Sequence, residues 1–220
     1  MRKLLGVLMA ALISLTTWNT AQAGAYEDFF LAIKFDDERR LRNLLLRGVD
    51  PNSVSENGFP AVGYAVIEDS PRALQALLLA PGLDVNALDA RGENALMTAA
   101  ARNKPEMVQM LLKHGAVQRS HGQWTAMHYA AASGSTESLS LLLKAGGLID
   151  VLAPNDSTPL MMAARQGKED AARYLLKEGA NPGLVNQAGF NAAGYAMKAQ
   201  RKDLAFEIMR REKALRNAKP

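Results

Sequence analysis

The chain has 220 residues, of which 48% are apolar, 22% are charged and none is cysteine; this is ordinary globular composition and excludes disordered, collagen-like and coiled-coil proteins. The lack of cysteine also excludes disulfide frameworks, cysteine-based zinc sites, thiol catalysis and lipid attachment to a cysteine. The net charge of +4 falls to 24 basic against 22 acidic residues when Arg2 and Lys3 are set aside. Much of the remaining basic charge lies in the last twenty residues, so no nucleic-acid-binding groove is predicted.

The first 23 residues have the features of a secretory signal peptide. Arg2 and Lys3 precede an apolar run over residues 4–15, and Ala21-Gln22-Ala23 gives a small-x-small ending. We expect cleavage after Ala23 and export to a bacterial periplasm, with secretion as the alternative. The run is too short to cross a bilayer, which takes about twenty helical residues, so no stable membrane insertion is expected. A buried helix of an intracellular protein is the competing interpretation, but such a helix should alternate apolar and polar faces.

The rest of the chain repeats with a period near 33. Equivalent positions are 34, 31, 33 and 33 residues apart and carry Pro60, Asn94, Thr125, Thr158 and Asn191. The fifth residue after each is alanine, and twelve residues later an aliphatic run begins. Ala32 and Leu44 fit an earlier copy. We therefore predict six units after the signal peptide 1–23, at about 25–58, 59–92, 93–122, 123–156, 157–189 and 190–220, with the first and last as polar caps.

Within a unit the residues predict two short helices. Thr158 can cap the first helix, and Pro159 has a suitable φ for its first turn. Gly134, Gly167 and Asn103 can adopt the left-handed conformation that ends this helix. A second apolar-faced helix then returns and ends at Gly115, Gly146 and Gly179 in three of the units.

Two segments state the motif most fully. Thr158-Pro159-Leu160-Met161-Met162-Ala163-Ala164 and Thr125-Ala126-Met127-His128-Tyr129-Ala130-Ala131 both resemble the ankyrin T-P-L-H-x-A-A signature. The resemblance covers nearly the whole mature chain. It implies an all-α fold, an ankyrin-repeat solenoid of about six helix-turn-helix units with short β-hairpin connections.

Candidate chemistry is sparse. The three histidines, His114, His121 and His128, are seven residues apart and could hold a metal only if one helix contained them, which Gly115 and Gly122 oppose. Methionines such as Met107 and Met110 suggest packing between helices more than copper binding. The sequence contains no hydrolase elbow, phosphate loop or zinc-protease motif. We therefore expect no enzyme activity, no metal and no cofactor.

The predicted site is a binding surface. The resemblance implies that a partner binds the concave face, which hairpin tips and the exposed side of the first helices form. Mapped by repeat position, the candidate protein-binding residues are Phe59, Glu68, Arg91, Glu93, Arg102, Trp124, Ser133, Arg165, Gln166 and Phe190. The aromatic ones are either anchors for a partner or side chains that pack under the hairpins. Tyr64, Tyr129 and Tyr195 share another position, where packing between repeats is expected.

The leading hypothesis is a non-catalytic, monomeric periplasmic scaffold that binds, inhibits, stabilises or supports another exported protein. Narrower versions are an immunity-type inhibitor of a toxin acting in the periplasm and an accessory factor for a periplasmic stress-defence enzyme. The competing classes are an enzyme and a protein attached to the envelope by its basic segment, residues 210–219.

Overall fold

The computed structural model describes residues 24–118 and 124–217, which fall into two compact units, residues 24–84 and the described residues from 85 onward. The predicted signal peptide, its cleavage point after Ala23, His121 and the loop around it lie outside the described residues. No helix in the described ranges is both long enough and apolar enough to cross a membrane.

The first unit contains two helix pairs. Residues 24–34 are helical and are followed by α2 (Glu38–Leu46), α3 (Ala61–Ile67) and α4 (Pro71–Leu78). Both α2 and α3 pack on α4. Phe29, Ile33 and Leu74 are fully buried and form part of the core that these helices share.

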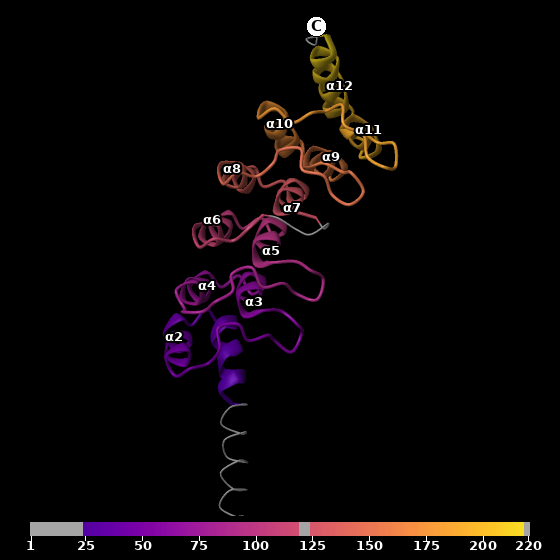
Figure 1. Ribbon diagram of the computed structural model, residues 1–220. Coiled ribbons are helices and arrows are strands. Elements are labelled where there is room, and N and C mark those ends of the chain that lie inside the picture. The colour runs from indigo at the N-terminus through magenta and orange to yellow at the C-terminus, as the bar shows by residue number, and fades with distance from the viewer. Residues whose placement is uncertain (1–23, 119–123, 218–220) are drawn as a thin grey trace, which may run out of the picture. The chain divides into compact units, whose positions relative to one another are not determined.

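The second unit contains four helix pairs. The helices are α5 (Ala95–Ala101), α6 (Pro105–Lys113), α7 (Ala126–Ser133), α8 (Thr136–Lys144), α9 (Pro159–Arg165), α10 (Glu169–Lys177), α11 (Ala192–Lys198) and α12 (Lys202–Asn217). The first helices of successive pairs pack on one another from α5 to α11, and the second helices, from α6 to α12, form a second row of contacting helices (Figure 1). Buried alanines on the first helices, such as Ala99, Ala130 and Ala163, allow this close approach.

Three of the first helices begin with a side-chain cap at the residue that opens their repeat. The backbone N–H of Met97 donates to Asn94 over 3.0 Å, that of Met161 to Thr158 over 3.3 Å, and that of Gly194 to Asn191 over 2.9 Å. Each bond satisfies a donor that the first helical turn leaves free. The start positions inferred from the repeat are thus confirmed.

Left-handed residues end the helices. Asn103, Gly134 and Gly167 follow the first helices with φ of 54°, 87° and 64°. Gly115, Gly146 and Gly179 follow the second helices with φ of 85°, 85° and 99°. Every residue that the sequence predicted for this role has a positive φ, because the chain must reverse within a few residues.

Replacing Gly167 by valine should lower the free energy of unfolding by about 1 to 3 kcal/mol, because a β-branched residue is forced to a positive φ. A Cβ atom at Gly167 would also lie 3.0 Å from Nε of Arg201. Gly63→Ala is the control, since Gly63 lies inside a helix and a Cβ there meets nothing within 4 Å. Thermal melts of both variants check the prediction; an unchanged melting temperature for Gly167→Val would contradict the helix boundary.

The connections between pairs are short hairpin loops. Four of them are closed by a backbone hydrogen bond between residues four apart, from Ser55 to Phe59 in the first unit, and from Asp89 to Glu93, Ala153 to Ser157 and Asn186 to Phe190 in the second. Within the described ranges the loops form no strand, and the bridge between Val54 and Pro60 is the one isolated β-pairing. The predicted connections are therefore hairpin-shaped turns without β-strands, and β-pairing among the described residues is limited to that bridge.

The last helix is less polar than a cap was expected to be. Phe206, Met209 and Leu215 of α12 are 55%, 42% and 49% exposed. Arg210, Arg211 and Lys213 are exposed on the same helix. The final helix thus presents both apolar and basic side chains.

Candidate functional site

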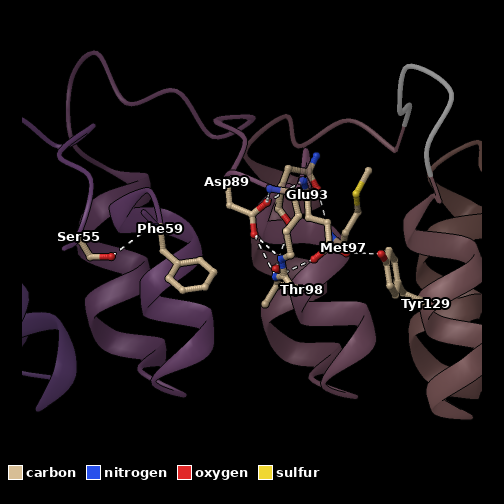
Figure 2. A network of polar contacts seen from close by, with 9 residues as sticks. Ser55, Phe59, Asp89, Glu93, Met97, Thr98 and Tyr129 are labelled. Carbon is tan, nitrogen blue, oxygen red and sulfur yellow. Dashed lines mark hydrogen bonds and ion pairs between the residues drawn. The ribbon is translucent and has the colours of Figure 1, made fainter. Parts of the chain in front are cut away.

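A network of polar contacts stabilises the hairpin of residues 89–93 in the second unit. The carboxylate of Asp89 accepts the backbone N–H groups of Arg91 and Glu93 over 2.9 and 3.0 Å (Figure 2). The Arg91 guanidinium lies 3.0 Å from the Asp89 carboxylate and 2.8 Å from that of Glu93. Burial acts to raise the pKa of Asp89, but the hydrogen bonds from Glu93 and Arg91 outweigh it and hold the pKa below its ordinary value.

Tyr129 connects this hairpin to the next repeat. Its hydroxyl on α7 donates to the Glu93 carboxylate, as Figure 2 shows. Burial and this carboxylate both raise the pKa of Tyr129 above its ordinary value. Contact between repeats, the role predicted for this tyrosine position, is therefore confirmed for Tyr129. Arg91 is exposed, but its positive charge is compensated by the carboxylates of Asp89 and Glu93.

Trp124 packs against a buried histidine. Its ring meets that of His128 edge to face, with centroids 5.2 Å apart, and Trp124 is half-buried. The Nδ1 atom of His128 accepts the backbone N–H of Thr125 over 3.1 Å, and its Nε2 atom donates to the carbonyl of Ser157 over 3.0 Å. His128 thus caps its own helix and bonds the next hairpin.

The free energy of unfolding should fall as the pH drops below about 6.5, which is the ordinary pKa of a histidine side chain. Burial lowers the pKa of His128 despite the Ser157 carbonyl, so the unfolded chain binds this proton more readily and protonation favours unfolding. The loss continues down to the lowered pKa of the folded state. His128→Gln keeps an acceptor for the Thr125 N–H without titrating, so its melting temperature should vary less between pH 7.5 and 5.5. Equal pH dependence in the two proteins would contradict this assignment.

Phe190 lies in a pocket with two cationic side chains. Its ring is 5.3 Å from that of Tyr195, and the ammonium group of Lys198 lies 3.9 Å from the Phe190 centroid. The pocket has a volume of about 420 Å³ and is lined by Arg165, Ala188, Phe190, Tyr195, Lys198 and Ala199. The structure therefore brings together two of the predicted binding residues, Arg165 and Phe190.

The other predicted residues of the second unit lie at helix ends. Arg102 and Gln166 are exposed C-cap residues of α5 and α9. Ser133 is half-buried, and its hydroxyl donates to the carbonyl of Ala100 over 2.8 Å, which assigns it to packing between α5 and α7.

Two predicted residues belong to the first unit. Phe59 is half-buried, and its backbone N–H donates to the Ser55 hydroxyl over 3.1 Å. Glu68 is half-buried at the end of α3 and, after burial, contributes to the raised pKa of Tyr64. Tyr64 itself packs edge to face on Phe30 of the preceding helix pair, as predicted for its position.

The sequence-based candidate set left out Lys198, although its repeat position maps to the predicted concave face, and it assigned the position of Tyr195 to packing between repeats. A usable indication exists, because Arg165 and Lys198 are each the seventh residue after the start of their repeats at Thr158 and Asn191. The position of the ammonium group over Phe190 depends on side-chain conformation, which repeat spacing does not specify. Among the described residues, no group of three or more histidine, aspartate or glutamate side chains could hold a metal ion.

Comparison with known proteins identifies similar chains. A family model described as ankyrin repeats in three copies matches residues 29–117, 62–155 and 145–215. An ankyrin repeat-containing protein of Treponema pallidum (strain Nichols) is 32% identical over 177 residues, which cover 78% of this chain and 58% of that protein. Protein glp-1 of Caenorhabditis elegans is 30% identical over 182 residues, which cover 76% of this chain and 14% of that protein. The chain thus spans less than two thirds of either relative.

A solved structure has the same architecture. The crystal structure of the ankyrin repeat domain of Bcl-3, a member of the IkappaB protein family, superposes with a TM-score of 0.72 at 27% sequence identity. The similarity covers 83% of this chain and 81% of that one.

Proposed function

Because this chain belongs to the ankyrin-repeat family, we propose that it is a non-catalytic periplasmic scaffold that binds another exported protein. Ankyrin repeats are protein–protein interaction scaffolds, and the fold is typically non-catalytic. The binding surface is the concave face of the second unit, by which we mean hairpins 89–93, 153–157 and 186–190 with the C-terminal ends of α5, α7, α9 and α11. Bound protein is inhibited, stabilised or supported by the scaffold.

The observation that carries this proposal is the fixed geometry of that face. The side-chain oxygens of Asp89 and Asn186 accept backbone N–H groups that hold two hairpin tips, and His128 holds a third by donating to the carbonyl of Ser157. Exposed polar side chains, among them Arg102 and Arg165, project from helices whose other sides are buried. A rigid surface loses little conformational entropy on binding, which favours affinity for a protein partner.

Affinity capture tests the proposal. The purified chain, immobilised, should retain a discrete protein from an extract of the native host's periplasm, and Lys113→Glu on α6 should retain it equally well. Failure to retain any protein from periplasmic, cytoplasmic and culture-medium extracts would contradict the scaffold function.

Export is a separate part of the proposal and rests on the charge and hydropathy of residues 1–23. Protein isolated from the host periplasm should begin at Gly24 when its mass is measured. Chain that accumulates in the cytoplasm with Met1 intact would contradict export while leaving the scaffold function open.

Two narrower functions fit the same surface, an immunity-type inhibitor of a periplasm-acting toxin and an accessory factor for a stress-defence enzyme. Genes adjacent to that of the chain would distinguish them. A second candidate, envelope attachment, is favoured by the exposed basic and apolar side chains of α12, such as Arg210 and Phe206. Binding to vesicles containing anionic lipid, lost at moderate salt, would support attachment.

A further inference from the structure

The second unit contains a pocket whose two cations form no ion pair with a carboxylate of the described chain. Arg165 ends α9 and Lys198 ends α11, and both are exposed. Among residues 24–118 and 124–217, neither forms an ion pair, and no acidic residue lines the pocket that they share. On the second helices of the same two pairs, the carboxylates of Glu169 and Glu207 pair with Arg173 over 2.9 and 3.0 Å.

The aromatic side of the pocket, formed by Phe190 and Tyr195, is held in place by hydrogen bonds. The side-chain oxygen of Asn186 accepts the backbone N–H of Phe190 over 3.1 Å, and its amide donates to the hydroxyl of Tyr195 over 2.8 Å. Asn186 is 5% exposed, so these two hydrogen bonds are shielded from solvent. The Phe190 ring in turn positions the Lys198 ammonium 3.9 Å from its centroid by a cation–π interaction.

Neighbouring repeats do not reproduce this arrangement. The positions equivalent to Arg165 and Lys198 are Ala101 on α5 and Ala132 on α7, which carry no charge. The positive pair is thus confined to the groove between α9 and α11, which pack directly on each other. A single pocket with two cations and an aromatic wall suits one small anionic group and does not provide the continuous basic track that nucleic acid requires.

We propose that the pocket between α9 and α11 is a carboxylate-binding subsite that takes an acidic side chain, Glu or Asp, from an extended segment of the partner protein. The methylene groups of that side chain pack on Phe190 and Tyr195, and its carboxylate lies between Arg165 and Lys198. Arginine favours paired hydrogen bonds to carboxylates, and lysine adds a point charge. The inference deepens the proposed scaffold function and rests on it, because it names the chemistry of the partner at one place.

A peptide titration tests the subsite without the partner. The purified ¹⁵N-labelled protein is titrated with acetyl-Gly-Glu-Glu-Gly-amide and, separately, with the Gln-Gln peptide of the same length. The Glu peptide should shift the amide resonances of Ala188, Phe190 and Lys198 in a saturable way, and the Gln peptide should not. Equal shifts with both peptides, or none with either, would overturn the proposal.

Matched variants separate the subsite from general electrostatics. Arg165→Gln with Lys198→Gln should weaken binding of the Glu peptide at least fivefold, whereas Lys144→Gln with Lys177→Gln, on the second helices, should change it less than twofold. Arg165→Lys with Lys198→Arg keeps the charge and should retain most of the affinity. Equal losses in the first two pairs would overturn the proposal, as would tighter binding of inorganic phosphate than of the Glu peptide.

Binding of the captured partner protein to the same variants gives a second test of the subsite. A partner that binds the wild type and loses at least fivefold in affinity for Arg165→Gln with Lys198→Gln supports the subsite. A partner that binds this variant and the wild type equally overturns the subsite and leaves the scaffold function intact. Glu-peptide binding at the pocket without any captured protein would contradict the scaffold function instead.

Discussion

His128→Ala is expected to lower the free energy of unfolding by about 3 to 4 kcal/mol, which is a large loss for a single substitution. The side chain is 1% exposed and makes bonds on both sides of its ring, to the Thr125 N–H and the Ser157 carbonyl. Alanine leaves the buried N–H of Thr125 without a partner, which costs about 1 to 3 kcal/mol. It also removes the bond from the ring to the Ser157 carbonyl, which keeps only the bond from the Ala153 N–H, and it leaves a cavity. Denaturant titration followed by circular dichroism measures the loss.

Two comparisons identify the cause. His128→Gln should cost less than His128→Ala because glutamine at this position can still accept the Thr125 N–H. His114→Ala should cost under about 1 kcal/mol, since His114 makes a single side-chain bond, to the Met110 carbonyl within its own helix. If the alanine variants at 114 and 128 were equally stable, His128 would not join the two repeats as described.

The second large effect concerns binding. Trp124→Ala combined with Arg165→Ala should weaken partner binding by about 2 kcal/mol or more, because partly buried tryptophan and arginine side chains dominate many protein interfaces. Arg165 is exposed beside Phe190 on the concave face of the second unit, and Trp124 precedes α7 on the same row of first helices. Calorimetric titration with the captured partner measures the change.

Fold and binding should separate in this experiment. The double variant should keep a helical circular dichroism spectrum, although Trp124→Ala removes the contact with His128 and should lower the melting temperature somewhat. Arg165→Ala alone provides a test free of that contact. Lys113→Glu, on the last turn of α6, should change affinity far less. Normal binding by the double variant with loss in Lys113→Glu would assign the partner to the second helices.

Much of the fold was predictable from the sequence because the same helix-capping and helix-ending residue types recur at the same positions of successive repeats. Asn94, Thr158 and Asn191 occupy the positions where a helix needs a side-chain acceptor, and the structure uses all three as caps. Gly134 and Gly167 occupy positions that need a positive φ. Such features depend on residues three to five positions apart, so their spacing along the chain is sufficient to find them.

The candidate site was less predictable because its contacts cross between repeats. Glu93 was expected to face a partner, yet it accepts the hydroxyl of Tyr129, which is 36 residues away. Trp124 was expected to bind or to fill a gap, and the structure places it against His128 of the same repeat, a contact that depends on the conformations of both side chains. Side-chain conformation and neighbour identity decide these contacts together, and a repeat alignment gives only the position from which each side chain starts.

Charge pairing was equally hidden. Arg91 and Arg165 look alike as exposed arginines of a repeat, but Arg91 lies between two carboxylates whereas Arg165 shares its pocket with Lys198. Arg165 is therefore the better candidate for binding a partner than Arg91. The partners of Arg91 lie within its own hairpin, whereas Lys198 reaches the pocket of Arg165 from the next repeat.

Site-specific photocrosslinking in the native host tests the central claim most directly. Benzoylphenylalanine in place of Gln166, an exposed residue at the end of α9, should give one discrete covalent adduct with another protein on irradiation of living cells. The same group in place of Lys177, exposed at the end of α10, is the matched control and should give no such adduct. An adduct from position 177 alone, or none from either position, would contradict a scaffold that binds its partner through the concave face.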